Sequence, residues 1–208
     1  VLSLNIDRRW RRFAVDRLLE RAPAAGRFLD SCAGTLDLSV ELAARPGFTG
    51  LVVASDFALP MLERGRSKVA GLAVRAACAD ALRLPFPDAS FDGAMVAFGV
   101  RNLAGLEAGL AEFARVLRPG APLVILEFTT PTWRPFRALY LFYFLRVLPA
   151  IGRLVSRHGS AYTYLPASVL EFPEPAELGK LMESAGFRAV SWWTRTGGIV
   201  AVHAGEKA

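Results

Sequence analysis

Short apolar runs of strand length alternate with longer segments of helical periodicity, and this alternation restricts the fold more than any other feature of the chain. The runs predict strands at 26–32, 50–55, 72–78, 91–97, 122–127, 189–194 and 199–203. The periodic segments predict helices at 8–21, 36–44, 59–68, 104–117 and 175–185. Strands that alternate with helices are typical of a parallel sheet with helices on both faces, so we expect a doubly wound α/β fold.

The last two predicted strands differ from the others in their connection. They are joined by Thr196-Gly197-Gly198, which is too short for a crossover helix. Such a connection predicts a hairpin, so we expect an antiparallel pair at the end of an otherwise parallel sheet. This arrangement differs from a plain dinucleotide-binding fold.

The length predicts a single domain over residues 1–208, because 208 residues with 53% hydrophobic content suffice for one large core but not for two. Residues 131–172 interrupt the alternation with a long aromatic and aliphatic stretch. In open α/β folds ligands bind at the carboxyl ends of the strands, so we expect this helical insert to lie over the active site.

The chain carries a formal net charge of +6, and its densest basic group is Arg8, Arg9, Arg11 and Arg12. Such a group fits a nucleic acid, an anionic membrane or an acidic substrate, and also a merely solvated surface. No nucleic-acid-binding module is recognisable, so we expect no nucleic acid partner. The two cysteines, Cys32 and Cys78, lack metal-ligand spacing and close apolar runs, so we expect them in the core and predict no metal site.

Small and acidic residues follow the first three predicted strands. The first turn holds Asp30 and Gly34, and Asp56 ends the second strand 22 residues beyond that glycine. A glycine permits a tight turn and close approach of a ligand, the following helix offers N–H groups to a carboxylate, and an acidic residue at the second strand accepts hydrogen bonds from ribose hydroxyls. After the third strand, Asp80 and Ala81 are placed to meet an adenine.

Each of these signals has a structural alternative. The turn is what any tight strand-to-helix connection needs, Asp56 could cap the next helix, and Asp80 could be an ordinary loop carboxylate. The glycine fingerprint of NAD and FAD enzymes, G-x-G-x-x-G, is absent. S-adenosylmethionine is therefore the nucleotide-like ligand that fits best.

Several motifs then resemble the ubiquinone/menaquinone biosynthesis C-methyltransferases. The specific ones are Phe98-Gly99-Val100-Arg101-Asn102 and Ala161-Tyr162-Thr163-Tyr164-Leu165-Pro166-Ala167-Ser168-Val169. Less specific ones are Arg83 to Asp88, Arg115 to Gly120 and Leu126-Glu127-Phe128. The similarity spans essentially the whole chain and implies a class I, Rossmann-like methyltransferase with a seven-stranded sheet.

The resemblance also implies roles for individual residues. The family's cofactor contacts fall on Thr35, Asp56, Asp80, Ala81 and Ala97, the last where the family often has serine. Arg101 falls on the arginine assigned a water-mediated role in substrate deprotonation, and a guanidinium is suited to stabilise a phenolate. Its alternative is a salt bridge or a loop contact. We expect Asn102 beside the loop and substrate, and an apolar tunnel for a polyprenyl tail that includes Tyr140, Tyr143, Tyr162 and Tyr164.

Leu36 departs from the family pattern, because it stands where the family has the second glycine of G-T-G-D. At a positive φ, leucine costs about 1–2 kcal/mol, and its side chain could enter the space of the methionine moiety. The competing hypothesis is therefore a non-catalytic methyltransferase-fold scaffold or lipid-binding protein of the quinone pathway that has lost its cofactor.

The resemblance implies methylation of a polyprenylated quinol ring, for which we expect demethylmenaquinol, giving menaquinol. The motifs leave a benzoquinol substrate, the tail length and a homodimer open. A lipid substrate and the basic group predict a cytoplasmic protein peripheral to the inner face of the membrane. The broken apolar stretch around 138–155 does not predict a span, and no secretory signal is recognisable.

Overall fold

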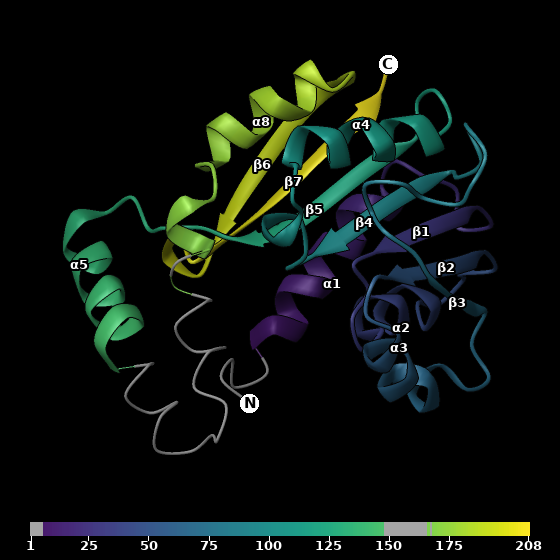
Figure 1. Cartoon of the computed structure of the whole chain (residues 1–208), viewed down its shortest axis with the longest axis horizontal. Coiled ribbons are helices and arrows are strands. Elements are labelled where there is room, and N and C mark those ends of the chain that lie inside the picture. Colours follow the sequence, from purple (N-terminus) through teal and green to yellow (C-terminus); the bar gives the residue numbers. More distant parts are fainter. Residues whose placement is uncertain (1–5, 148–165, 167) are drawn as a thin grey trace.

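The central feature of the computed structural model, which describes residues 6–147, 166 and 168–208, is one seven-stranded sheet in the order β3-β2-β1-β4-β5-β7-β6 (Figure 1). The strands are β1 (Arg27–Ser31), β2 (Leu51–Asp56), β3 (Val74–Cys78), β4 (Gly93–Ala97), β5 (Pro122–Phe128), β6 (Phe187–Arg195) and β7 (Val200–Lys207). The first five run parallel, and β7 pairs antiparallel with both β5 and β6. The predicted fold class and the antiparallel end are confirmed.

The last strand of the chain lies inside the sheet, between β5 and β6. Its residues from Val200 to Gly205 are all buried, whereas β6 exposes residues such as Arg188 and Trp192. A strand covered on both faces is mostly apolar, and the buried polar residue of this one, His203, has its Nε2 2.9 Å from the Pro175 carbonyl oxygen. An edge strand tolerates contact with water. The burial of β7 and the partial exposure of β6 therefore agree with their places inside the sheet and at its edge.

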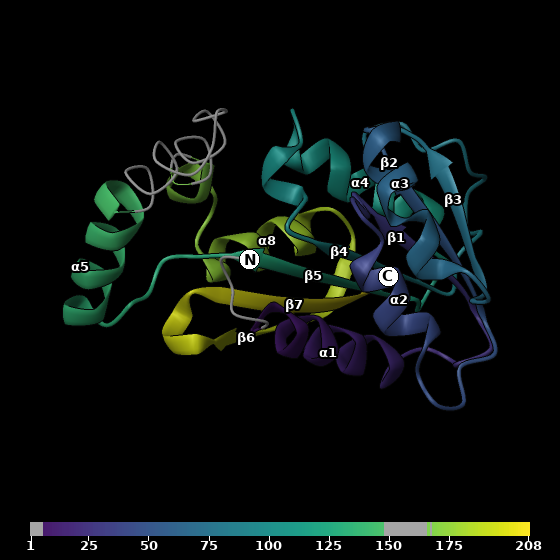
Figure 2. The ribbon, with the colours of Figure 1, turned by 90° about the horizontal axis from the view of Figure 1, so that it is seen from below.

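Helices cover both faces of the sheet. One apolar cluster joins α4 (Leu106–Val116) and α8 (Pro175–Ser184) to one face, through residues such as Phe113, Leu178 and Met182. A second cluster joins α1 (Ile6–Leu19) and α2 (Asp37–Ala43) to the other face, through Trp10, Leu18 and Leu42. Figure 2 shows α1 and α4 on opposite sides of the strands.

A hydrogen bond between two residues that are distant in sequence fixes the rotation of α1 about its axis. The indole Nε1 of Trp10 donates to Thr196 Oγ1 at 2.9 Å, in the short 3₁₀ turn Thr196–Gly198 that links β6 to β7. The same indole meets Phe98 and Phe128 edge-on, with ring centroids 6.3 Å away in each case. Three separate segments thus hold the N-terminal helix against the sheet.

The predicted insert begins with α5 (Arg134–Phe142) and continues as a π-helical turn, Tyr143–Val147. In Figure 1, α5 stands apart from the sheet. Tyr140 is its buried residue and packs in a small cluster with Val169, Phe128, Leu141 and Ile199. Residues 148–165 and 167, including the predicted Tyr162 and Tyr164, lie outside the described residues.

Most predicted elements agree with the observed ones within two or three residues. The predicted helix at 59–68 divides into α3 (Leu59–Gly65) and a 3₁₀ turn, Arg66–Val69. The expectation that both cysteines lie in the core was wrong for Cys78, which is exposed because β3 is an edge strand. Among the described residues, no helix is long and apolar enough to cross a bilayer.

Candidate active site

A cavity of about 620 Å³ opens at the carboxyl ends of β1, β2 and β4. Its wall includes every residue that the sequence predicted for the cofactor: Asp30, Gly34, Thr35, Asp56, Asp80, Ala81 and Ala97. Asn102 also lines it. Parallel strands bring their carboxyl ends to one edge, so residues from distant parts of the sequence meet there.

Asp56 links two neighbouring loops at this edge. Its Oδ2 accepts a hydrogen bond from the backbone N–H of Gly34 at 2.7 Å, and its Oδ1 accepts one from Ala58 at 2.8 Å. The second contact closes a local turn before α3 and is not the helix cap anticipated as an alternative, because Ala58 is the N-cap residue of α3 and that helix has no side-chain cap. An ionised carboxylate has about four acceptor sites, so Asp56 keeps the capacity to bind hydroxyls as well.

The turn after β1 has free space beside the backbone of Gly34. Gly34 has φ of 52°, and a Cβ there would meet nothing nearer than the end of Met61 at 3.9 Å, so a ligand can approach this backbone. Thr35 donates its hydroxyl to Asp37 Oδ2 at 2.8 Å, and Lys68 binds Asp37 Oδ1 at 2.8 Å. These contacts order the turn and the start of α2.

Leu36 adopts the left-handed conformation anticipated from the sequence, with φ of 66° and ψ of 19°. Its side chain is fully buried with Ala54 and Leu62, beneath α3, and does not line the cavity. Gly65 makes room for it, because a Cβ at that glycine would lie 2.7 Å from Leu36 Cγ. The expectation that leucine could occupy the methionine space was therefore wrong.

Asp30 is buried on the cavity wall at the end of β1. Its Oδ2 accepts a hydrogen bond from Ser39 Oγ at 2.5 Å, whereas Oδ1 has no hydrogen-bond partner among the described residues. Burial raises the pKa of this carboxyl to about 7, against the effect of the Ser39 hydrogen bonds. An orphaned, buried acceptor beside a cavity is suited to a cationic group of a ligand.

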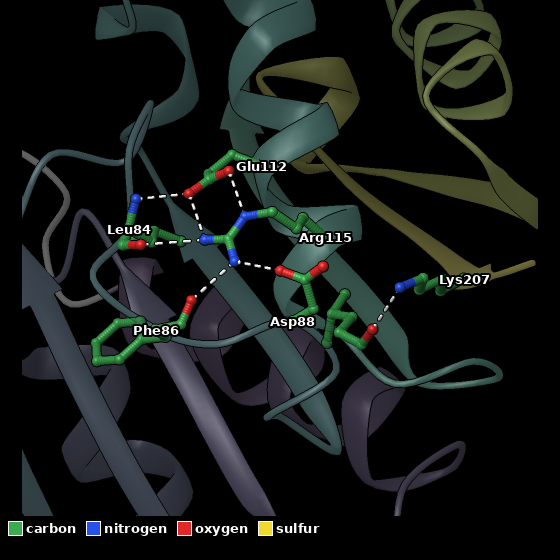
Figure 3. A network of polar contacts seen from close by, with 7 residues as sticks. Leu84, Phe86, Asp88, Glu112, Arg115 and Lys207 are labelled. Atoms are coloured by element: carbon green, nitrogen blue, oxygen red, sulfur yellow. Dashed lines mark hydrogen bonds and ion pairs between the residues drawn. The ribbon is translucent and has the colours of Figure 1, made fainter.

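Asp80 and Ala81 lie in the long β3–β4 connection, which polar contacts of Arg115 and Glu112 anchor to α4 (Figure 3). Arg115 donates to Glu112 on its own helix, to the carbonyls of Leu84 and Phe86 at 3.0 and 2.8 Å, and to Asp88 at 2.7 Å. Its hydrogen bonds hold the pKa of Glu112 below the ordinary value. The motif Arg83 to Asp88 thus serves to fix the loop that carries this part of the wall.

Arg101 lies in the 3₁₀ turn Val100–Asn102 after β4. Its Nη1 donates to the Phe98 carbonyl at 2.6 Å and to Glu127 Oε1 at 2.7 Å. This is the salt bridge and loop contact that the sequence left open as its alternative role. The Nε is buried with no hydrogen-bond partner among the described residues, so the guanidinium retains donor capacity.

A second cavity, of about 800 Å³, shares Leu103 with the first and is lined by Arg101. The start of α4, Leu181 of α8, and Ser168, Glu171, Phe172 and Pro173 also line it. Tyr140 and Tyr143, predicted for the substrate, line neither cavity: Tyr140 is in the cluster around Val169, and Tyr143 is 41% exposed.

Four further residues complete the site: Arg11, Asp37 and Phe57 on the first cavity, and Glu127 beside Arg101. Asp37 and Glu127 stand inside motifs and could have been found there, but nothing local in the sequence marks Arg11. Burial raises the pKa of Glu127 against the effect of Arg101. Burial also raises the pKa of the Cys32 thiol on the cavity wall to about 12, so it does not supply a thiolate nucleophile at neutral pH.

A sheet of this order, with a cavity at the carboxyl ends of its strands, is the fold of the class I methyltransferases. Solved structures share the fold. A SAM-dependent methyltransferase of Thermotoga maritima has a TM-score of 0.64 at 20% identity, covering 99% of this chain and 97% of that one. Phosphoethanolamine N-methyltransferase 2 of Haemonchus contortus, in complex with S-adenosylmethionine, has 0.68 at 13% identity, covering 94% and 52%.

The chain belongs to the ubiE/COQ5 methyltransferase family, which it matches over residues 1–207. The demethylmenaquinone methyltransferase of Thermus thermophilus is 48% identical over 210 residues, covering 100% of this chain and 93% of that protein. The ubiquinone/menaquinone biosynthesis C-methyltransferase UbiE of Geobacter sulfurreducens is 46% identical, covering 100% and 81%. The family expected from the motifs is confirmed, and the non-catalytic alternative is not favoured.

Proposed function

We propose that residues 1–208 act as one methyltransferase domain that transfers a methyl group from S-adenosylmethionine to the ring of a polyprenylated quinol, demethylmenaquinol. One observation supports the proposed positions of S-adenosylmethionine and of the quinol. The residues predicted for the cofactor line one cavity, and Arg101 lines a second cavity that shares Leu103 with it. When bound, the cofactor supplies an electrophilic methyl group on its sulfonium.

The described residues fit the cofactor by charge and size. The volume of the cavity lies within the usual range for a small-molecule site. We assign Asp30 Oδ1 to the cofactor's ammonium, Asp56 to the ribose hydroxyls, and Asp80 with Ala81 to the adenine. Phe57, which lines the cavity with its side chain 80% exposed, offers a ring face to the base.

Arg101 and Asn102 are assigned to the substrate. Carbon methylation needs an electron-rich ring, which a quinol becomes when a hydroxyl loses its proton. A permanently charged guanidinium stabilises the resulting phenolate and can orient a water that takes the proton. Hydrogen bonds to Glu127 and to the Phe98 carbonyl fix the guanidinium in place, so little side-chain reorganisation is needed when the ring binds.

The catalytic assignment is tested with Arg101→Lys and Arg101→Ala in assays of menaquinol formation. We expect both to lower kcat by roughly 10²–10³ and to leave the Kd for S-adenosylmethionine within a few-fold of wild type, in line with the loss of one transition-state donor. Unchanged kcat in a folded Arg101→Ala variant would limit Arg101 to its salt bridge.

The cofactor placement is tested with Asp56→Asn, for which calorimetry should show binding of S-adenosylmethionine weakened about tenfold or more. Glu183→Gln is the matched control, because Glu183 is an exposed carboxylate of α8 that lines neither cavity. Equal affinities of the two variants would remove Asp56 from the cofactor site.

Membrane association remains part of the proposal. From Phe128 to Val147 the chain has no acidic residue, and α5 with its flanks exposes Trp133, Leu139 and Phe142 beside Arg134 and Arg137. Exposed aromatic and basic residues together suit an anionic membrane surface, to which Arg8 and Arg9 also contribute charge. Sedimentation with anionic and with neutral vesicles measures this, and equal recovery with both would contradict it.

A further inference from the structure

The wall of the first cavity has an unequal charge distribution. Four of its residues are carboxylates, Asp30, Asp37, Asp56 and Asp80, and Arg11 is the one basic residue among the described residues that line it. S-adenosylmethionine at neutral pH bears a sulfonium and an ammonium, which suit these carboxylates, and also a carboxylate, which they repel. A cofactor carboxylate in this cavity therefore needs a donor of its own.

Fewer backbone N–H groups of the turn after β1 remain to bind a carboxylate than the sequence predicts. The N–H groups of Ala33, Gly34 and Leu36 are already bonded, to Ser55 O, Asp56 Oδ2 and Ala33 O, at 3.0, 2.7 and 2.9 Å. The helix that follows, α2, has only seven residues and begins at Asp37, whose carboxylate would repel an anion. The expected anion site at this helix start is therefore weak.

Arg11 reaches the cavity because α1 packs across the sheet. Trp10, Ala14, Val15 and Leu18 form the buried stripe of this helix, and the contact of Trp10 with Thr196 fixes its rotation. Arg11 lies beside that stripe, with its side chain 19% exposed. Its Nη1 donates to Asp7 Oδ2 at 2.6 Å, one turn earlier, which leaves further guanidinium donors.

Arg11 thereby differs from the other arginines of its helix. Arg8, Arg9 and Arg12 are exposed, and the Arg12 side chain contacts Glu41 at 3.5 Å. Arg11 instead interacts electrostatically with Asp30 and Asp37 on the cavity wall. A single basic group predicted from the sequence is thus divided by the fold between the surface and the cavity.

We propose that Arg11 binds the carboxylate of the amino-acid moiety of S-adenosylmethionine, and that Asp7 orients its guanidinium. The inference rests on the cofactor placement proposed above. A planar guanidinium suits a carboxylate because it can donate two parallel hydrogen bonds. Arg11 would then set the preference of the site for a cofactor with an intact amino-acid end.

The test compares S-adenosylmethionine with decarboxylated S-adenosylmethionine, which lacks only the carboxylate. Calorimetry gives the Kd of each for wild type, Arg11→Gln and Arg9→Gln, the last being the same charge change on the exposed side of α1. We expect Arg11→Gln to weaken binding of the complete cofactor about 10- to 100-fold and binding of the decarboxylated one less than about threefold. Arg9→Gln should change neither.

Other outcomes would contradict the proposed role of Arg11. Equal weakening of both ligands by Arg11→Gln would show a structural role, and no weakening would exclude the contact. Thermal melting checks that the variant folds, and Arg11→Lys, which keeps the charge, should lose less affinity than Arg11→Gln. Failure of wild type to bind either ligand or methylthioadenosine would overturn the cofactor placement itself, whereas binding without preference for the carboxylate would overturn only the role of Arg11.

Discussion

At the scale of single residues, Leu36 shows how a strained position is tolerated beside a ligand site. Its positive φ costs about 1–2 kcal/mol, yet full burial of a leucine side chain stabilises the fold by roughly 1.5–3 kcal/mol. The side chain achieves this burial on the far side of the turn from the cavity. The backbone strain at Leu36 therefore does not block the cavity.

Replacing Leu36 by glycine should destabilise the protein. Removal of a buried leucine side chain costs about 3 kcal/mol or more, and relief of the positive φ returns about 1 kcal/mol, so we expect a net loss of about 2 kcal/mol in the free energy of unfolding. Urea denaturation measures this. Binding of S-adenosylmethionine should stay within a few-fold of wild type, and a glycine variant that is more stable, or binds tenfold tighter, would contradict the packing described.

Asp30 should make stability depend on pH. Because its pKa is raised from 3.8 to about 7 in the folded state, the folded protein binds more protons than the unfolded chain between these values. The free energy of unfolding contributed by this group therefore falls as pH rises from about 4 to about 7, by at most about 1.4 kcal/mol per pH unit.

The matching variant is Asp30→Asn, which keeps an acceptor for Ser39 and removes the titration. Melting temperatures of wild type and variant, measured from pH 4 to pH 8, should diverge in favour of the variant as pH rises. A constant difference between them across this range would show that Asp30 is ionised in the folded protein throughout.

At the scale of elements, the turn after β1 and helix α3 are packed as a unit around Gly65. A Cβ at this position would lie 2.6 Å from the Thr35 carbonyl oxygen, as well as 2.7 Å from Leu36 Cγ. Contact with backbone cannot be relieved by a side-chain rotation. The close approach of α3 therefore fixes the turn on which Gly34 and Thr35 meet the cavity.

Gly65→Ala should consequently cost about 1–3 kcal/mol of stability and weaken binding of S-adenosylmethionine, because the turn has to move. Gly105→Ala is the control: its Cβ would lie 3.6 Å from Ala108 Cβ, an ordinary contact, and should cost under about 1 kcal/mol. Denaturation and calorimetry on the two variants separate a general glycine effect from the specific clash. Similar losses of stability and of cofactor binding in the two variants would contradict the predicted clash at Gly65.

At the scale of the whole molecule, the fold segregates charge. The chain has a net charge of +6, but four carboxylates line the cavity that we assign to a cationic cofactor. Basic residues gather instead on exposed parts of α1 and α5. The positive net charge therefore reflects the solvent-exposed surface and does not indicate the acidic character of the cavity.

A ligand that touches the ends of several strands should stabilise the entire domain. At a cofactor concentration 100 times its Kd, the added stability is about 2.7 kcal/mol, which corresponds to a rise of roughly 5–10 °C in Tm for a chain of this size. Calorimetric melting with and without S-adenosylmethionine measures the shift. Asp56→Asn should reduce it at the same cofactor concentration, and an unshifted wild-type Tm would contradict the cofactor placement.

Local patterns in the sequence determined the elements, the class of fold and the family. Strand-length apolar runs, helical periodicity and the short Thr196-Gly197-Gly198 link are local properties, and the motif around Arg101 is contiguous in the chain. The departure of Leu36 from the family pattern was visible in the sequence as well, whereas its φ of 66° came from the structure. Such features need no knowledge of which segments pack together.

Only the tertiary structure decided where side chains point and what they meet. The insertion of β7 beside β5, the burial of Leu36 under α3 and the approach of Arg11 to the cavity each join segments distant in sequence. The exposure of Cys78 likewise depends on β3 having a neighbour on one side alone. The physical reason is the same in each case: burial and pairing are set by long-range packing, which residue type and spacing do not encode locally.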